Sequence, residues 1–555
     1  MLLRLYCPIR GQSGRKRAMK IRVSRLILIV SGFALVAGGL SAYFFHARGK
    51  RAVENYRRQL VANGEKLTVQ ELYPPALPPA QNSLATFQTA NRLLGRHHFF
   101  DTNGPTAMRS VKPGKAMIAW AQPNVRNEKT NTWEEIQAAA ADDRELVELL
   151  ETIIDRPALD FHLDYGVGFT LLLPHLAPLK QCAQRLSITA ICDLQRGNAE
   201  SACMKIRTIL AIVKGIEDER LIISQLVRIA IANIGIAVTW ELLQSPKVTD
   251  EQLTILQREW IDAEFLRGSE NALLMERAMC EAAGARMRQS SAEFRQNAMM
   301  YSRGSSSAGL SGWAEQLANS AILKTKESMW RFAWSDPDEL KMLRGQQVIL
   351  GALRRARTNE PFVSALREQE TGLAALGVHA KDSDNGFYGI DDNVSSMMSQ
   401  SLVSIQKFPQ RIFRTEAARQ IVIAALALKR YQLRHGVYPR ELAALKPELL
   451  TEVPHDLMDG KPVRYRLNPN GTYVLYSVGE DGKDDDGSAS PVGPSKTTGW
   501  LQGRDWVWPA PASDDEVALF YAKEAATRAG GKALADFEKR YGLNVTNISQ
   551  TNSPK

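Results

Sequence analysis

One stretch of the sequence constrains the whole chain more than any other. Residues 26–45 read LILIVSGFALVAGGLSAYFF, twenty residues without a charge. A helix of this length spans about 30 Å, which is the thickness of the hydrocarbon core of a bilayer. The sequence therefore predicts a transmembrane helix, with the rest of the chain folded on one side of a membrane.

The charges around this stretch predict its orientation. No acid and eight cations precede it: Arg4, Arg10, Arg15, Lys16, Arg17, Lys20, Arg22 and Arg25. The positive-inside rule then places the N-terminus in the cytoplasm and the bulk of the chain outside it. We expect a single-pass protein of a bacterial inner membrane, periplasmic or otherwise extracytoplasmic. The alternative is a signal peptide cleaved after Ser41 or Ala42, but its apolar region would be unusually long.

The net charge of +10 does not indicate a nucleic-acid partner. The N-terminal cations account for most of the excess, and no nucleic-acid-binding module accompanies them. The hydrophobic content of 44% and charged content of 23% are ordinary for a folded protein. Because 555 residues exceed what one core usually organises, we expect two or more domains.

The predicted fold class is mainly α: a transmembrane helix, a large α-helical ectodomain and a small C-terminal α+β module. The predicted boundaries are 1–25 for a basic cytoplasmic segment, 26–45 for the membrane helix, 46–82 for a stalk and Pro-rich linker, 83–374 for the helical domain, 375–410 for a linker, 411–510 for the module and 511–555 for a charged tail. Apolar residues at helical spacing predict helices at 132–153, 175–195, 199–214, 218–243, 249–264, 269–297 and 337–357.

Two features of the helical domain allow specific predictions. Gly197-Asn198 interrupts a helical pattern and predicts a helical hairpin that places Cys192 opposite Cys203. We expect buried thiols there rather than a disulfide, because packed helix axes are usually about 8–10 Å apart. Residues 229–240, IAIANIGIAVTW, are too few to span a membrane and predict a buried core helix.

The helical domain contains no P-loop, GxGxxG, HExxH or GxSxG motif. His162, His175, Glu276 and Arg277 are isolated candidates for catalysis. A cavity that brings several of them together would favour an enzyme. The sequence identifies no small-molecule substrate, and an enzyme is the less favoured interpretation.

The C-terminal module begins with a predicted amphipathic helix at 411–436, with Arg430 and Arg434 off its apolar stripe. A short helix at about 440–446 follows. The pattern VRYRL predicts a half-buried strand, NPNG a turn, and TYVLYS a returning strand. The acidic run from Glu480 to Gly487 comes directly after that strand, with a net charge of −4.

These residues carry a resemblance. ALALKRYQLRHGVYP, DGKPVRYR and YVLYSVGEDGKDDDG resemble the C-terminal half of the major pseudopilins of type II secretion, over roughly 415–508. The prepilin-peptidase site of that family is missing, and some 365 residues separate the membrane segment from the module's helix. The module therefore looks attached to an unrelated helical domain, which itself resembles uncharacterised bacterial envelope proteins.

The resemblance implies a calcium ion in the loop after the last strand, closed by a later Asp at the position of Asp505. Oxygen-rich acidic loops suit Ca²⁺, although an EF-hand register does not fit. The predicted ligands are Asp481, Asp484, Asp486 and Asp505, with Ser477 or nearby carbonyls contributing. The alternative is a solvated acidic turn.

The sequence thus predicts a membrane-anchored extracytoplasmic protein of interaction or structural type. Its pseudopilin-like module would be stabilised by Ca²⁺ and would contact a protein partner in the envelope. The main alternative is a membrane-tethered hydrolase with its active site in the helical domain. An atypical component associated with a pilus is a third possibility.

Overall fold

The computed structural model describes residues 44, 46–301, 324–358, 360–379, 396–492 and 499–540. The predicted membrane helix at 26–45 lies outside these residues except for Phe44, as do residues 380–395 of the predicted linker and the tail beyond 540. The described end of the predicted linker is not free of helices, because α15 (Ser401–Ile405) and the start of α16 (Phe408–His435) lie within 375–410. The described chain is mainly α-helical with small sheets, as the sequence predicts.

The chain forms two compact units, each assembled from separate stretches of sequence. Of the described residues, those within 1–67, 280–345 and 379–404 form the first unit, and those within 68–279, 346–378 and 405–555 form the second. The domain boundaries predicted from the sequence stay predictions.

In the first unit, residues 46–62 are helical, as expected for the stalk. Val53 and Leu60 are buried, and Arg57 pairs with Glu281 and Glu339, so this helix packs within the unit. The other elements of this unit are the end of α10 (Leu266–Gln289), α11 (Ser291–Tyr301), a π-helical turn (Trp330–Trp334), the start of α13 (Ser335–Arg357) and part of α15 (Ser401–Ile405).

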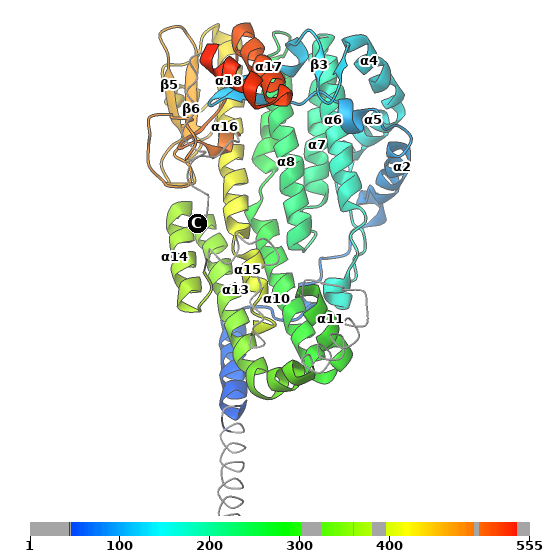
Figure 1. Ribbon diagram of the computed structural model, residues 1–555, viewed down its shortest axis with the longest axis vertical. Coiled ribbons are helices and arrows are strands. Elements are labelled where there is room, and N and C mark those ends of the chain that lie inside the picture. The colour runs from blue at the N-terminus through cyan, green and yellow to red at the C-terminus, as the bar shows by residue number, and fades with distance from the viewer. Residues whose placement is uncertain are drawn as a thin grey trace, which may run out of the picture. The chain divides into compact units, whose positions relative to one another are not determined.

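The second unit is built around long helices that lie side by side (Figure 1). Its helices are α2 (Leu84–Leu94), α3 (Phe100–Asn103), α4 (Trp133–Asp142), α5 (Arg144–Glu151), α6 (Leu176–Gln195), α7 (Ala199–Gly215), α8 (Ile222–Leu243), α9 (Asp250–Asp262), most of α10, the end of α13, α14 (Phe362–Ala375), α16 (Phe408–His435), α17 (Asp514–Ala529) and α18 (Gly531–Arg540).

The predicted helical hairpin is confirmed. Gly197 adopts φ +75°, a conformation that favours glycine, and the Asn198 side chain caps α7 at the Ser201 amide. Cys192 and Cys203 are buried free thiols, and burial raises the pKa of each to about 12. The expectation of buried thiols is therefore confirmed, but Cys192 packs in a cluster with Phe100 and Ile136, whereas Cys203 Sγ contacts the Gln252 carbonyl.

Among the described helices, α8 passes a length and composition test for a membrane span, but 61% of its apolar window is buried inside the protein. This agrees with the predicted core helix. Helix α16 differs from its prediction. Residues 421–428 are all buried, so the helix is surrounded rather than amphipathic. Arg430 is buried as well, and its Nε lies 2.7 Å from Asp250 Oδ1.

Three small sheets complete the second unit. In the module, β5 (Arg464–Leu467) and β6 (Tyr473–Ser477) form the predicted antiparallel pair, and β7 (Trp506–Val507) extends it. β1 (Arg109–Lys112) and β2 (Lys115–Met117) form a hairpin, and β8 (Ala510–Pro511) pairs with β2 in parallel. The short β3 (Val125–Arg126) and β4 (Thr130–Asn131) pair with each other.

Candidate functional site

The predicted calcium ligands lie in and beside the acidic loop. Asp481 Oδ1 accepts a hydrogen bond from the Lys483 amide at 3.0 Å. Asp505 is fully buried and accepts from the amides of Asp485, Gly487 and Ser488 at 2.8–3.3 Å. Asp505 therefore shapes the loop through its backbone. This contact ties the loop to the segment before β7.

The other predicted ligands bind protein groups as well. The Ser477 hydroxyl donates to Asp456 Oδ1 at 2.7 Å. Asp484 accepts from the Tyr476 hydroxyl at 2.9 Å and from Arg464 at 3.3 Å. Burial raises the pKa of Asp484, but the Tyr476 hydroxyl, the Asp486 amide and Arg464 outweigh it, so the pKa lies below its usual value.

Arginines supply the counter-charge that the acidic loop needs. The pairs are Arg414 with Glu480, Arg464 with Asp484, Arg504 with Asp485, and Arg466 with Asp486. In the part of the chain that the structure describes, no group of three or more His, Cys, Asp or Glu side chains could hold a metal ion. Calcium binding stays a prediction. It would require Asp484 and Asp486 to exchange arginine contacts for the metal.

The four candidates for catalysis lie in different surroundings. His175 is buried against Glu219, which also accepts from the Ser224 hydroxyl. Glu276 is partly buried and accepts from the Ile222 amide at 3.0 Å, and burial raises its pKa to about 7. Arg277 donates to Gln347.

His162 is the exposed member of the four. It lines a cavity of about 460 Å³ whose wall also contains Tyr73, Glu217 and Arg267. Its Nδ1 lies 3.2 Å from Asp160 Oδ2. His175, Glu276 and Arg277 are not among the residues that line this cavity, so the convergence that would favour a hydrolase is not seen there.

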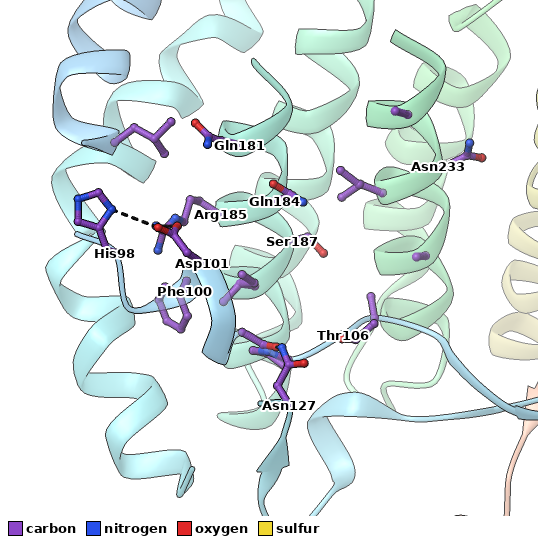
Figure 2. Close-up of a pocket in the computed structure, with 18 of the residues that line it drawn as sticks. His98, Phe100, Asp101, Thr106, Asn127, Gln181, Gln184, Arg185, Ser187 and Asn233 are labelled. Carbon is purple, nitrogen blue, oxygen red and sulfur yellow. Dashed lines mark hydrogen bonds and ion pairs between the residues drawn. The ribbon is translucent and has the colours of Figure 1, made fainter. Parts of the chain in front are cut away.

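A larger cavity, of about 740 Å³, lies elsewhere in the second unit, and we call it the groove. Its lining comes from α2, α3, α6, α8 and the segment 104–107. Gln181, Gln184 and Ile188 recur at helical spacing along α6, and Ala230, Asn233 and Ala237 do so along α8. Figure 2 shows Gln181, Gln184, Arg185 and Ser187 on α6. Asn233 lies on the neighbouring helix, α8, and Thr106 lies on the segment that follows α3.

The groove is lined by uncharged polar side chains that are not engaged elsewhere. In the described part of the chain, the following have no hydrogen-bond partner within the protein: Asn91, Thr106, Gln181, Gln184, Ser187 and Asn233. Ser187 is only 7% exposed. The lining therefore offers free donors and acceptors to a ligand.

The charged groups in the groove are already paired. Arg185 is 4% exposed, and it donates to Asp101 Oδ1 at 2.9 Å, to the His97 carbonyl at 2.7 Å and to Asp143 Oδ2 at 3.4 Å. The Asp101 carboxylate also contacts His98 at 3.1 Å. Since Arg185 is neutralised, the groove is poorly suited to phosphate or another anion.

The apolar part of the lining completes the description of the groove. Leu94, Pro105, Ile188 and Ile234 lie among the amides. A ligand that fits would therefore present both hydrogen-bonding groups and small apolar groups.

Sequence reasoning missed the groove, since its residues are distributed between positions 91 and 237. One signal was present. Asn233 stands in the middle of the apolar run 229–240 and is exposed, although that run predicts a buried helix. A polar residue in such a run indicates a place where the helix leaves the core.

No protein-family model matches the chain, and neither a curated protein nor a solved structure matches it. The pseudopilin resemblance of the module therefore stays a prediction that rests on the quoted motifs.

Proposed function

We propose that this protein is an extracytoplasmic interaction protein that binds an extended, uncharged polypeptide segment of a partner in the groove. The observation that carries the proposal is the set of unpartnered amide and hydroxyl side chains along α6 and α8. A volume of about 740 Å³ lies within the range of roughly 300–1,000 Å³ that is usual for ligand sites.

The chemistry of the lining favours a peptide. An extended chain carries one amide donor and one carbonyl acceptor per residue, and these groups cannot pair within a single strand. Asn and Gln side chains offer both kinds of partner. Ile188 and Ile234 would contact small apolar side chains of the same segment. A glycan would be expected to meet exposed aromatic rings, but Phe100 is buried against Arg185.

The remaining sequence predictions belong to the same proposal. Residues 26–45 would anchor the protein in the inner membrane, with the groove and the module outside the cytoplasm. The pseudopilin-like module would provide a second contact with a protein partner. Ca²⁺ would bind the acidic loop through Asp481, Asp484, Asp486 and Asp505. These parts are independent of the groove and are tested separately.

The proposal is tested by applying the labelled full-length protein, in detergent, to arrays of uncharged decapeptides and to a glycan array. We expect binding to a subset of peptides and not to glycans. Ala230→Trp fills the groove and should abolish the binding. Asn233→Ala should weaken it about fivefold, since one hydrogen bond contributes about 1 kcal/mol.

Gln88→Ala is the matched control, because Gln88 is an exposed amide on α2 that does not line the groove. It should leave the binding unchanged. Binding to glycans alone would overturn the peptide class. Binding that survives Ala230→Trp in a folded variant would overturn the groove itself.

A further inference from the structure

The segment 104–119 crosses one end of the groove from α6 to α8. At α6, Gly104 lies so close that an added Cβ would stand 2.4 Å from Ile188 Cδ1. A larger residue at position 104 would displace the Ile188 side chain, and Asn127 Nδ2 donates to the Gly104 carbonyl at 2.8 Å. Pro105, Thr106 and Ala107 then line the groove. We call residues 104–107 the groove wall.

At α8, a single glutamate side chain holds Met108, the residue that directly follows the groove wall. Glu241 is fully buried near the end of α8, and its Oε1 accepts from the Met108 amide at 2.8 Å. The same carboxylate accepts from the Ala119 amide at 3.0–3.1 Å. The Trp120 indole donates to the Glu241 carbonyl at 3.1 Å. Glu241 therefore binds both ends of the β1–β2 hairpin.

The backbone conformation at Met108 is one that needs stabilising contacts. Met108 has φ +48°, which is uncommon for a residue with a side chain. Such a conformation persists where neighbouring contacts hold it. The Glu241 carboxyl group accepts from amides at both ends of the β1–β2 hairpin, so one buried side chain fixes both segments. Glu241 supplies such a contact at Met108, directly beside the groove wall.

We infer that Glu241 is the positioning residue of the groove. It does not line the groove, but it fixes Met108 and thereby the adjacent Ala107, Thr106 and Pro105. The effect on ligand affinity rests on the proposed function, whereas the effect on the wall does not. Loss of the carboxylate should release the wall while α6 and α8 stay folded.

The first arm of the test measures amide hydrogen exchange in the full-length protein without ligand. In Glu241→Ala, the Met108 and Ala119 amides lose their acceptor and should exchange about 10- to 100-fold faster. Glu241→Gln keeps an oxygen at the position of Oε1, which accepts from the Met108 amide, so exchange at Met108 should stay close to that of the unchanged protein.

Glu276→Ala is the matched control. Glu276 is a partly buried carboxylate that likewise accepts from a backbone amide, that of Ile222. Its loss should increase exchange at Ile222 and leave Met108 and Ala119 unchanged. Equal loosening of the wall in both alanine variants would overturn the inference, because it would indicate general destabilisation.

The second arm measures affinity for a decapeptide selected on the array. Glu241→Ala should weaken binding about tenfold or more, and Glu241→Gln should restore it. If the wall loosens and affinity does not change, Glu241 does not position the binding site and the inference is overturned. If no peptide binds the unchanged protein, the proposed function fails, and the exchange arm alone decides whether Glu241 holds the wall.

Discussion

The acidic loop and the groove are opposites in how their polar groups are used. The loop concentrates its charges in eight consecutive residues, and Arg414, Arg464, Arg466 and Arg504 pair with them. The groove collects uncharged side chains from distant parts of the sequence, and several of them have no hydrogen-bond partner among the residues that the structure describes. The acidic loop, which looks reactive in the sequence, has its charges paired within the protein. The amides of the groove, which look ordinary in the sequence, are left to solvent or to a ligand.

This difference shows that a run of charges is a weak guide to a ligand site. Like charges in consecutive residues repel one another, so the folded state is more stable when cations pair with them. Exposed Asn and Gln side chains carry no such electrostatic penalty, because water supplies their hydrogen bonds. An open set of polar groups in a cavity is thus the better indication of a ligand, and the following predictions test both sides of the comparison.

The largest expected effect is a loss of stability in the strands beside the acidic loop. Arg464 is 14% exposed and contacts Asp484, Asp459 and the fully buried Asp456. Arg464→Ala leaves Asp456 without its cation, and breaking a buried pair costs about 3–5 kcal/mol. We expect the free energy of local opening at β6, measured by amide exchange, to fall by about 3 kcal/mol.

Arg466→Ala is the matched comparison. Its pair with Asp486 is exposed on both sides, and such pairs contribute about 0–1 kcal/mol. Similar losses in the two variants would mean that the loop depends on its total charge rather than on the buried Arg464 contacts.

Much of the fold could be predicted from the sequence, because helical periodicity and turn residues act locally. The hairpin at Gly197-Asn198, the strand pair around NPNG and helices α6, α7, α8 and α9 agree with their patterns. Helix α16 was misjudged as amphipathic. Periodicity records the apolar side of a helix, but not that α8, α9 and β6 cover it from several directions.

The next largest effect would come from calcium. A ligand at one hundred times its dissociation constant stabilises the protein that binds it by about 2.7 kcal/mol. If the loop binds Ca²⁺, exchange of the Gly487 and Ser488 amides should slow on adding calcium and recover with a chelator. Asp481→Ala should abolish this response.

Asp481 is the suitable predicted ligand to remove, because among the described residues its side chain accepts a hydrogen bond only from the Lys483 amide. Asp505→Ala would release three loop amides and could not separate metal binding from folding. Exchange that is insensitive to calcium would leave the arginines as the sole counter-charge of the loop.

The groove could not be predicted because its formation depends on tertiary packing. Gln181 and Gln184 stand on a helix whose other residues are largely buried, and nothing local to them indicates that Asn233 lies nearby. Glu241 was missed for a similar reason. A glutamate at the end of an apolar helix reads as a solvated residue, but here it meets two amides from 122 and 133 positions earlier in the chain.

A smaller effect is expected from the charge of Glu241. Burial raises the pKa of Glu241 to about 8, against an ordinary value of 4.5. The folded state therefore holds a proton that the unfolded state releases, so stability is highest below pH 4.5 and falls as pH rises toward 8. Glu241→Gln should remove this loss. We expect the variant to gain on the order of 1–3 kcal/mol relative to the unchanged protein between pH 5 and pH 8.

Thermal unfolding of the two proteins across this pH range checks the prediction. The difference between them isolates Glu241, since Glu276 and the buried acids are common to both. A constant difference between pH 5 and pH 8 would show that the Glu241 carboxylate is ionised throughout.

The smallest expected effect on stability is in the groove. Gln181, Gln184 and Asn233 are exposed, and their side chains have no hydrogen-bond partner among the described residues. The triple alanine variant should change the free energy of unfolding by less than about 0.5 kcal/mol, the usual range for surface substitutions. Alanine is also the better helix former, so a slight gain is expected. Peptide binding should nevertheless fall about 100-fold, because three hydrogen bonds of about 1 kcal/mol are lost. A variant that loses stability by several kcal/mol would show that these amides serve the fold, and the contrast between the groove and the acidic loop would disappear.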